Sequence, residues 1–316
     1  MMRSAIRACA VVLALLTWGC GGGGADTWQS GVTSSQRHLS GVAFHGERLG
    51  WVVGDEDTIL HTADGGKTWQ TQREGEPGSS PRILNCVAFV DDSIGWAGGS
   101  LGVLYVTSDG GQTWRPQDTP VAEGILDLHF LNRSEGWAVG GRGVILHTTN
   151  GGGSWDVQHS NDEHLWSVHF ADEEHGWAGG DNARLLITND AGARWSPVEL
   201  PIESSVYDVH FLDTRRGWLV SMDGLIMRTT NGGSTWTAQE SPTRQTLRAI
   251  DFVDATNGWI GGEAGAVVRT TDGGATWQSV EYPNPSGMLN LPHLLGAARA
   301  GSRICLVGEN GTVVMR

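Results

Sequence analysis

Charged side chains are scarce in this sequence, and positive ones most of all. Only 18 % of the 316 residues are Asp, Glu, Lys or Arg, and Lys67 is the single lysine. The 35 acidic residues against 21 basic ones give a formal net charge of −14 at pH 7. Because polyanions repel such a chain, the composition excludes nucleic acid and the bare surface of an anionic membrane as expected partners.

Long hydrophobic runs are also absent. No stretch approaches the roughly 18 apolar residues of a membrane-spanning helix. The longest run, residues 8–17, is shorter and follows Arg3 and Arg7. A basic start followed by a short apolar run is typical of a secretion signal. Residues 1–20 are therefore predicted to be a signal peptide, and residues 21–25 a glycine-rich tether.

The segment around Cys20 resembles the signal of a bacterial lipoprotein. In such signals the cysteine becomes the lipidated N-terminus of the mature protein, and a flexible tether such as residues 21–24 follows it. The resemblance implies an exported protein anchored to the bacterial membrane through Cys20, either in the periplasm or at the cell surface. Ordinary cleavage and secretion is the alternative. Apart from this lipid, no contact with a membrane is expected.

Helical periodicity is missing, whereas 47 glycines and 15 tryptophans are present. A tryptophan preceded by glycine recurs every 40 to 45 residues, at Trp51, Trp96, Trp137, Trp177, Trp218 and Trp259. A second series has the same interval and comprises Trp28, Trp69, Trp114, Trp155, Trp195, Trp236 and Trp277. A third comprises Phe44, Phe89, Phe130, Phe170, Phe211 and Phe252. A fixed interval of this length indicates a repeat architecture.

Each repeat carries four short strand signals separated by turn residues. In the repeat that begins at Ile125, the strands are predicted at 125–130, 136–140 and 144–148, with a fourth after a tight turn at 149–155. Four strands in about 41 residues are typical of one blade of a β-propeller. The sequence therefore predicts an all-β fold over residues 26–316, a seven-bladed propeller of four-stranded antiparallel blades.

The two ends of the chain are predicted to complete one blade together. Residues 304–308 and 311–316 match the second and third strands of a repeat, but no fourth strand follows them. Residues 26–30 match a fourth strand without the other three. Their pairing would remove the open edge of the last sheet. In this arrangement Cys86 and Cys305 lie on blades that are not neighbours, so we expect two buried free thiols and no disulfide.

The turn before each fourth strand is an Asp-box, the bacterial neuraminidase repeat, with the pattern Ser/Thr-x-Asp-x-Gly-x-Thr-Trp. Its side-chain oxygen can accept backbone N–H bonds within the turn, and its glycines permit positive φ. Calcium binding or catalysis would need a single site, whereas these turns are spread over six repeats. The six acceptor residues are therefore predicted to be structural: Asp64, Asp109, Asn150, Asp190, Asn231 and Asp272.

The combination of GWAVG, G-x-[IV]-L-x-T and T-[DN]-G-G-x-T-W resembles one family in particular. This family is the photosystem II assembly and stability factor propellers of cyanobacteria and chloroplasts, with their relatives in non-photosynthetic bacteria. The resemblance covers about residues 26–316. It implies an exported, seven-bladed, non-catalytic scaffold that binds a protein, such as a membrane protein during assembly. The photosynthetic members use an arginine-rich patch, and here no local run of basic residues exceeds Arg215 and Arg216.

Enzymes with Asp-boxes are the main alternative class. A retaining sialidase needs an arginine triad, a tyrosine nucleophile with a glutamate partner, and an acidic acid/base residue. Tyr105 is predicted to lie away from the axis, and Tyr207 on an innermost strand has no matching glutamate. His129, His169 and His210 share one position on successive innermost strands and could face a metal ion; packing between strands is the preferred interpretation. We expect no enzyme activity, no cofactor and no metal.

A protein partner is expected at one face of the ring. Two connections between blades are longer than the repeat allows, at residues 71–81 and 281–292, and both lie on the same face. On the innermost strands, the residue four positions before each Phe differs from blade to blade. The residues predicted to contact the partner are Arg82, Trp166, Tyr207, Arg248, Tyr282, Met288 and Leu289. The expected function is protein binding by a monomer during assembly of a membrane or envelope complex. A passive surface propeller and a glycan-binding or sialidase-like propeller are the alternatives.

Overall fold

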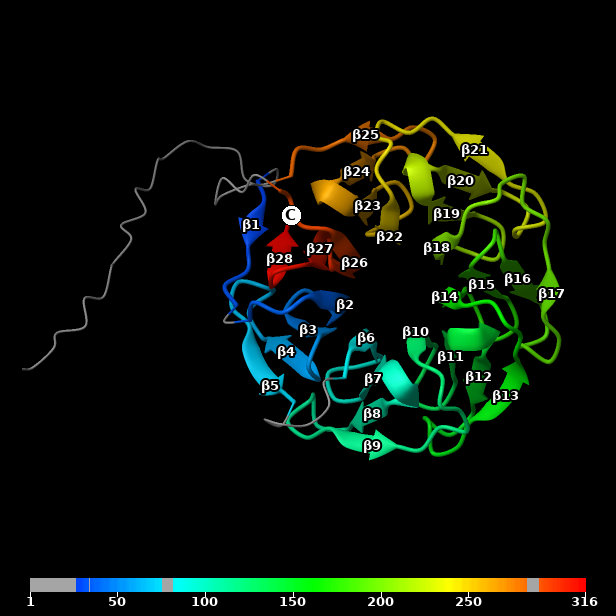
Figure 1. The fold of residues 1–316 in the computed structure, drawn as a ribbon. Coiled ribbons are helices and arrows are strands. Elements are labelled where there is room, and N and C mark those ends of the chain that lie inside the picture. The colour runs from blue at the N-terminus through cyan, green and yellow to red at the C-terminus, as the bar shows by residue number, and fades with distance from the viewer. Residues whose placement is uncertain (1–26, 34, 76–81, 283–289) are drawn as a thin grey trace, which may run out of the picture.

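A computed structural model describes residues 27–33, 35–75, 82–282 and 290–316. Over this part of the chain, seven four-stranded antiparallel sheets stand around a central axis (Figure 1). The predicted seven-bladed propeller is therefore confirmed. The predicted signal peptide, Cys20 and the predicted tether lie outside the described residues. None of the helices among the described residues has the length and apolar character that crossing a bilayer requires.

The strands repeat in the same order in every blade. The innermost strands are β2 (Leu39–His45), β6 (Leu84–Phe89), β10 (Ile125–Phe130), β14 (Leu165–Phe170), β18 (Val206–Phe211), β22 (Leu247–Phe252) and β26 (Leu294–Ala300). The second strands are β3 (Leu49–Gly54), β7 (Gly95–Gly99), β11 (Gly136–Gly140), β15 (Gly176–Gly180), β19 (Gly217–Ser221), β23 (Gly258–Gly262) and β27 (Arg303–Gly308).

The third and outer strands are shorter. The third strands are β4 (Thr58–Thr62), β8 (Leu104–Thr107), β12 (Ile145–Thr148), β16 (Leu185–Thr188), β20 (Ile226–Thr229), β24 (Val267–Thr270) and β28 (Thr312–Met315). The outer strands are β5 (Gln70–Arg73), β9 (Arg115–Gln117), β13 (Asp156–His159), β17 (Ser196–Pro197), β21 (Thr237–Gln239), β25 (Gln278–Ser279) and, in the seventh blade, β1 (Gln29–Ser30). Single 3-10 turns join second to third strands at η1 (Ser100–Gly102), η2 (Gly141–Gly143), η3 (Met222–Gly224) and η4 (Glu263–Gly265).

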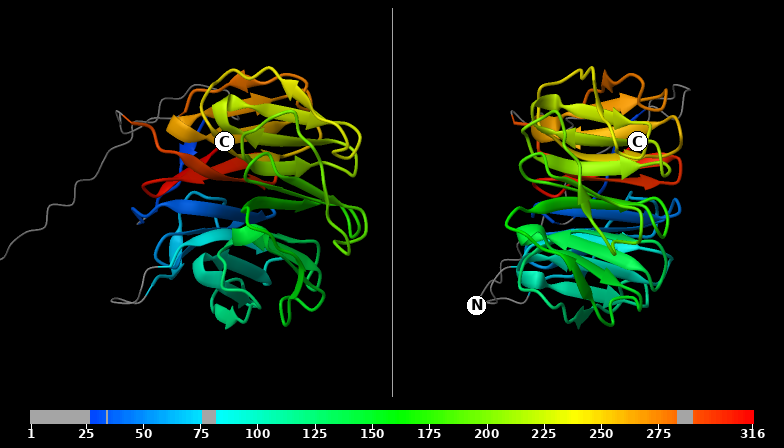
Figure 2. Two further views of the ribbon diagram at one scale, coloured as in Figure 1. Left: turned by 45° about the vertical axis from the view of Figure 1, so that its right-hand side comes forward. Right: turned by 90° about the vertical axis from the view of Figure 1, so that its right-hand side faces the viewer.

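Two faces result from this connectivity, and the strands run between them (Figure 2). We call one the funnel face; it carries the connections between blades and the turns from second to third strands. The other, the Asp-box face, carries the six Asp-boxes and the turns from first to second strands. The described strand ends that the two long connections join, those of β5 and β6 and those of β25 and β26, lie at the funnel face, whereas residues 76–81 and 283–289 lie outside the described residues.

Aromatic stacking between neighbouring blades fills the core. In the first five blades the Trp of the second strand packs on the Phe of the next blade, stacked with ring centroids 3.4 to 3.6 Å apart at four interfaces and tilted at 4.3 Å at the fifth. The glycine before each Trp makes this possible: a Cβ on Gly95 would lie 2.5 Å from the ring of Phe89. The Gly-Trp pair is thus a packing requirement of the repeat.

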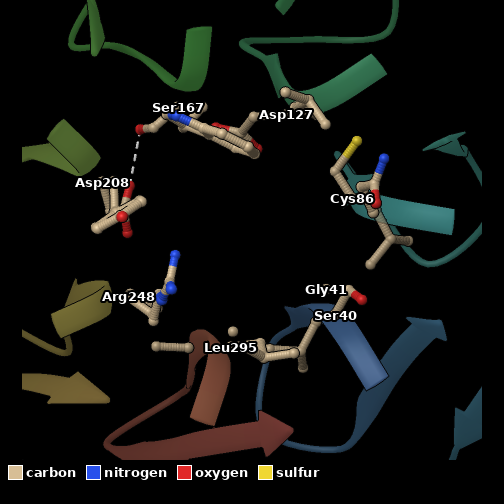
Figure 3. Close-up of a pocket in the computed structure, with 17 residues that line it drawn as sticks. Ser40, Gly41, Cys86, Asp127, Ser167, Asp208, Arg248 and Leu295 are labelled. Carbon is tan, nitrogen blue, oxygen red and sulfur yellow. Dashed lines mark hydrogen bonds between the residues drawn. The ribbon is translucent and has the colours of Figure 1, made fainter. Parts of the chain in front are cut away.

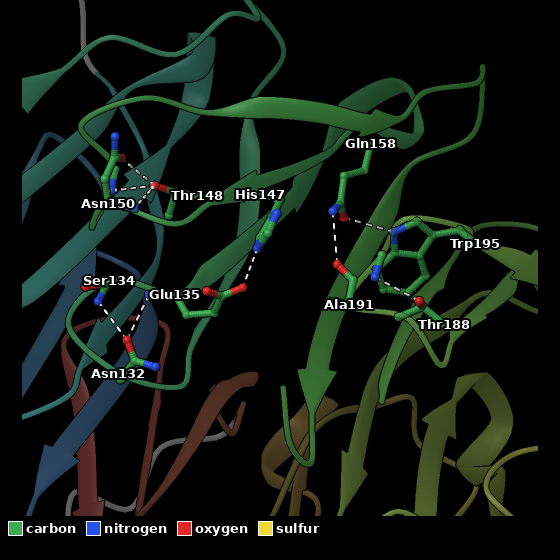
Figure 4. Close-up of polar contacts among 12 residues, drawn as sticks. Asn132, Ser134, Glu135, His147, Thr148, Asn150, Gln158, Thr188, Ala191 and Trp195 are labelled. Atoms are coloured by element: carbon green, nitrogen blue, oxygen red, sulfur yellow. Dashed lines mark hydrogen bonds and ion pairs between the residues drawn. The ribbon is translucent and has the colours of Figure 1, made fainter. Parts of the chain in front are cut away.

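The Asp-boxes are turn staples, as the sequence predicts. In the second blade, Asp109 Oδ1 accepts bonds from the Thr107 hydroxyl and the Thr113 amide, at 2.8 and 2.9 Å, while Asp109 Oδ2 bonds the Thr113 hydroxyl at 2.6 Å. Asn150 Oδ1 likewise accepts the Thr148 hydroxyl (Figure 4). It also accepts the Ser154 amide, and the Asn150 amide nitrogen donates to the Ser154 hydroxyl. Gly110 and Gly111 adopt φ of 72° and 86°, which a side chain would disfavour.

The N-terminal strand closes the ring. β1 pairs with β28 through Gln29 opposite Met315 and Ser30 opposite Val314, so the seventh sheet has the order β1-β28-β27-β26. Trp28 packs edge-on against Trp259, with centroids 5.6 Å apart. This confirms the predicted clasp. The cysteine prediction is also confirmed: Cys86 and Cys305 are both buried and free.

Candidate functional site

A funnel opens along the axis between the innermost strands. Its cavity has a volume of about 300 Å³ and is lined by residues of all seven innermost strands (Figure 3). On one side the lining consists of small or apolar side chains such as Ser40, Gly41 and Leu295. On the other side it is aromatic and charged, with Trp166, Tyr207 and Arg248. The funnel is therefore chemically one-sided although the fold is nearly symmetric.

Trp166, Tyr207 and Arg248 form a continuous arc on three successive blades, which we call the aromatic–arginine arc. The rings of Trp166 and Tyr207 have centroids 6.3 Å apart, and the Arg248 guanidinium lies 4.1 Å from the centre of the Tyr207 ring. Each of the three is the extra residue of a β-bulge, because the pairing to the second strand skips it. The same bulge occurs in the other four blades and re-aims the extra side chain toward the mouth of the funnel, so the arc is distinguished by the types of its three side chains.

Acidic residues of the neighbouring turns fix the ends of the arc. The Trp166 indole N–H donates to Asp181 at 2.7 Å, and the Trp166 ring stacks on His164. Arg248 forms an ion pair with Glu263 at the start of η4. Burial alone would raise the pKa of the Glu263 carboxyl. The hydrogen bond from Arg248 and its positive charge have the larger effect, so the pKa of Glu263 lies below its usual value. The arc is thus pre-ordered, which reduces the entropy that binding would cost.

Two carboxylates lie deeper in the funnel, on β10 and β18. Asp127 accepts the backbone N–H of Val168 on the next blade at 2.9 Å, and Asp208 accepts that of Ile250 on the next blade at 2.8 Å. The Ser167 hydroxyl donates to Asp208 at 2.8 Å. Burial raises the pKa of Asp127 and of Asp208 to about 7, and the charge of Asp127 adds to the effect on Asp208.

These two carboxylates are ties between blades. Asp251 makes the same kind of link, accepting the amide of Arg299 on the next blade at 2.6 Å, and Ser167 Oγ accepts the amide of Val209. Because such hydrogen bonds between neighbouring innermost strands recur in several blades, we assign them a structural role in holding the blades together. The sequence analysis did not single out Asp127 and Asp208; the signal available was their shared position three residues before Phe130 and Phe211.

A layer of three histidines lines the axis nearer the Asp-box face. His129 and His169 have ring centroids 4.9 Å apart, as have His169 and His210, and His210 Nδ1 lies 3.5 Å from Asp251. Burial lowers the pKa of His129 to about 4 and that of His210 to about 3. Within the described ranges no three His, Cys, Asp or Glu residues have the geometry to hold a metal ion.

The remaining predicted contact residues have different locations. Arg82 is exposed on the funnel face, across the ring from the arc, and its guanidinium donates to the Tyr105 hydroxyl at 3.1 Å. Tyr282, which a partner contact would require to be exposed, is instead only 8 % exposed and packs with Trp259 and Leu294, and burial raises its pKa. Met288 and Leu289 lie outside the described residues.

Exposed apolar side chains also occur on the funnel face. Of the five exposed large hydrophobic residues in the described part of the chain, three belong to this face, namely Ile83, Leu101 and Met222. Leu101 is 75 % exposed at the tip of η1, and Met222 is 40 % exposed in η3. Ile83 and Leu101 belong to the second blade and Met222 to the fifth, so these side chains are separate points on the funnel face and not one continuous patch.

A comparison of this sequence with models of protein families identifies the family to which the chain belongs. The model described as "Photosynthesis system II assembly factor YCF48" matches residues 24–118, 77–162, 112–200 and 193–286, which together span most of the chain. The chain belongs to this family. Among curated protein sequences, none matches it.

Solved structures of the family share the fold. A structure titled "YCF48 bound to D1 peptide" is 20 % identical, with a TM-score of 0.76 and coverage of 92 % of this chain and 95 % of the other. YCF48 from Cyanidioschyzon merolae is 22 % identical, with a TM-score of 0.74 over 91 % and 98 % of the two chains. A GH74 xyloglucanase from Xanthomonas campestris is 14 % identical, with a TM-score of 0.71, covering 90 % of this chain and 53 % of the enzyme. At these identities the similarity establishes the fold.

Proposed function

We propose that this protein binds a segment of a partner protein at the funnel face, through the aromatic–arginine arc, and assists the assembly of a membrane or envelope complex after export. The arc carries the proposal: Trp166, Tyr207 and Arg248 stand side by side on bulged strands, on one side of an otherwise small-residue funnel. Tryptophan, tyrosine and arginine are the residues that contribute most to protein interfaces.

The family supports the same class of function. In one solved structure YCF48 is bound to a D1 peptide, so a propeller of this family can bind a segment of another protein. By analogy, the partner segment would lie across the funnel mouth, with one side chain inserted between the arc and the small residues opposite. The family also supports a non-catalytic role, and Asp127 and Asp208 then act as ties between blades.

Location outside the cytoplasm completes the proposal. A lipid on Cys20 would hold the protein at the membrane, and the tether of residues 21–25 would let the propeller reach a membrane protein under assembly. A monomer suffices for this function, because the arc lies within a single chain.

A pull-down from native membranes tests the proposal. The lipidated full-length protein is compared with the variants Trp166→Ala and Arg248→Gln, and with the matched control Arg215→Ala on the Asp-box face. Truncation of an interface hot spot costs about 2 kcal/mol or more, which is roughly a 30-fold loss of affinity. We expect a membrane-protein client with the native protein and the control, and its loss from both arc variants.

Other outcomes have definite meanings. A client that is retained by the arc variants would reject the funnel mouth as the site. A native protein that captures no client would reject the assembly role and favour a passive surface propeller. Capture of glycan fragments in place of protein would favour the glycan-binding alternative.

A further inference from the structure

The funnel is built of two layers of side chains, with one residue from every innermost strand in each layer. The upper layer holds the extra residue of each bulge and includes the arc. The lower layer holds the residue that follows it, namely Gly41, Cys86, Asp127, Ser167, Asp208, Ala249 and Gly296. Five of these seven are small and uncharged, so closing the ring does not require a carboxylate at this position. Asp127 and Asp208 are therefore departures from the repeat.

Asp127 and Asp208 border the open centre of the funnel (Figure 3). Their hydrogen bonds come from neutral groups. The donors are backbone amides and one hydroxyl, those of Leu128, Val168, Ile250 and Ser167. An ionised carboxylate has about four lone-pair sites, so both groups can accept a further donor while they tie the blades together.

No positive charge compensates these two carboxylates within the described part of the chain. Arg248, the arginine of the funnel lining, is engaged by Glu263. The charge of Arg299 acts on His210 and Asp251, which lie nearer the Asp-box face. The three histidines of the axis are neutral at pH 7, because burial lowers their pKa values. The funnel thus holds two carboxylates without a counter-ion.

Burial without a counter-ion is unfavourable for a carboxylate, and it raises the pKa of both groups to about 7. The charge of Asp127 adds to the effect on Asp208. A ligand that brings a positive charge beside them would relieve this cost, since an opposite charge favours the ionised form. An anionic or apolar ligand would leave the cost in place. The lower layer is therefore complementary to a cation.

The rim of the funnel is negative as well. The turns from second to third strands hold two arginines, Arg142 and Arg184, and each pairs with an acidic residue of a neighbouring connection. The same turns hold seven acidic residues. Three of these pair with an arginine, namely Glu56, Asp57 and Glu263. The other four have no arginine partner among the described residues and are Asp55, Asp181, Asp223 and Glu309.

The connections between blades add to this excess of negative charge. Among their described residues that form no ion pair, two are arginines, Arg82 and Arg244, and six are acidic. The acidic ones are Asp118, Glu123, Glu199, Glu203, Glu240 and Glu281. Such a surface attracts a basic segment over about a Debye length, roughly 10 Å at 0.1 M salt. Charge complementarity therefore selects a basic partner.

We propose that the partner segment bound at the arc is basic, and that one of its Lys or Arg side chains enters the funnel and places its charge at Asp127 and Asp208. The stem of this side chain would pass the rings of Trp166 and Tyr207, whose faces attract a cation. A cavity of about 300 Å³ accommodates one long side chain and excludes a folded element. Because it names the side chain that the bound segment inserts, this proposal rests on the proposed function.

Selection from random peptides displayed on phage tests the proposal, with the purified full-length protein as bait. Peptides captured by the native protein are compared with those captured by Trp166→Ala. We expect the peptides that need Trp166 to share a Lys or Arg at one fixed position. In the corresponding synthetic peptides, replacing that Arg by citrulline or that Lys by norleucine removes the charge and should weaken binding at least tenfold. Added salt should also weaken binding, because the contact is electrostatic.

Variants of the protein locate the contact. Asp127→Asn combined with Asp208→Asn keeps an acceptor oxygen at both positions but removes the charge, and should weaken binding of the synthetic peptide at least tenfold. Asp251→Asn is the matched control, because Asp251 is a third buried carboxylate that ties two blades but lies outside the funnel lining. It should bind the peptide as the native protein does. Ser40→Lys leaves both carboxylates in place and adds a cation to the upper layer, so it should weaken binding. Thermal unfolding verifies that each variant is folded.

The remaining outcomes separate this proposal from the proposed function. Peptides that need Trp166 but share no basic residue would overturn the cationic side chain and leave segment binding at the arc standing. Equal affinity of the native protein, the double Asn variant and Ser40→Lys would do the same. If no captured peptide depends on Trp166, the funnel mouth is not a peptide site, and both proposals fail.

Discussion

Single polar residues hold the repeated turns of this propeller, and the natural variation among the six Asp-boxes shows which atoms matter. Asp109 and Asn150 occupy equivalent positions, and in both the Oδ1 atom accepts the same two bonds. The second side-chain atom differs: a carboxylate oxygen accepts from Thr113, whereas an amide nitrogen donates to Ser154. Because a hydroxyl can act as donor or acceptor, the turn accommodates both.

The Asp-box interpretation predicts unequal effects of two substitutions at Asp109. Asp109→Asn should leave the free energy of unfolding nearly unchanged, because the Oδ1 bonds of the turn are kept, as they are at Asn150. Asp109→Ala should lower the free energy of unfolding measurably more, because three donors lose their acceptor. Chemical denaturation at pH 7 measures both values. Equal losses would show that the carboxylate charge has a role beyond the turn.

The histidine layer predicts a dependence of stability on acid. Burial, together with the charges of His210 and His129, lowers the pKa of His169 well below 6.5. The folded protein therefore binds fewer protons than the unfolded chain below pH 6.5, and stability is lost as the pH falls through this range. Asp127 and Asp208, with pKa values of about 7, act in the opposite direction, since their contribution is lost as the pH rises from about 4 to 7.

A variant isolates the histidine contribution from that of the carboxylates. Between pH 6.5 and 5, His169→Gln should lose less stability than the native protein, by about 2 kcal/mol, because one pKa unit corresponds to about 1.4 kcal/mol. Denaturation curves at the two pH values measure the difference. Parallel losses in the two proteins would mean that His169 is protonated in the folded state.

At the level of strands, β1 determines whether the ring is closed. It contributes two paired residues and places Trp28 in the hydrophobic cluster of Trp259 and Leu294. The edge of β28 would otherwise present unpaired backbone groups. In the seventh blade it takes the place of the outer strand that follows an Asp-box in the other six. The closed ring and the irregular seventh blade therefore have the same cause, the pairing of the N-terminal strand β1 with β28.

Removing the tryptophan of this clasp should destabilise the whole ring. We expect Trp28→Ala to lower the free energy of unfolding by up to about 3 kcal/mol, toward the lower end of the range for large-to-small changes of buried aromatic residues. Gln29→Ala, at an exposed position of the same strand, should change it by less than about 0.5 kcal/mol. Thermal and chemical unfolding of the two variants compares them. Similar stabilities would mean that the clasp does not hold the ring closed.

The sequence predicts most of the strands because each carries its own short-range signal. The interval of Trp and Phe residues sets the number of blades, and the Asp-box residues set the turns. The orphan strand at residues 26–30 is recognisable since it matches a fourth strand. The bulges that aim Trp166 and Tyr207 into the funnel have no such local signal, as they depend on how two strands pair.

On the scale of the whole molecule, near-symmetry makes departures from the repeat informative. The position four residues before each Phe could be recognised as variable, which identified Trp166, Tyr207 and Arg248. Tyr282 was misjudged because a loop residue with an aromatic ring can fold back into the core when the adjacent blade leaves space for it. The acidic lower layer of the funnel could not be foreseen, because it depends on which side chains the innermost strands bring together around the axis.

The two proposals concern successive layers of one funnel. The upper layer carries the aromatic–arginine arc, which suits a protein segment. The lower layer carries two carboxylates without a counter-ion among the described residues, which suits a cationic side chain of that segment. Both features occur where the sequence breaks the repeat, since a feature present in every blade serves the fold.

Site-specific photocrosslinking at the funnel mouth is the most direct test of the central claim. A benzoylphenylalanine in place of Tyr207 keeps an aromatic ring in the arc, and the same residue in place of Val157, which is 49 % exposed on the outer strand β13, is the control. In membranes of the native host, we predict that position 207 crosslinks to one defined segment of a membrane or envelope protein and that position 157 does not. Equal crosslinking from both positions, or none from position 207, would contradict the account.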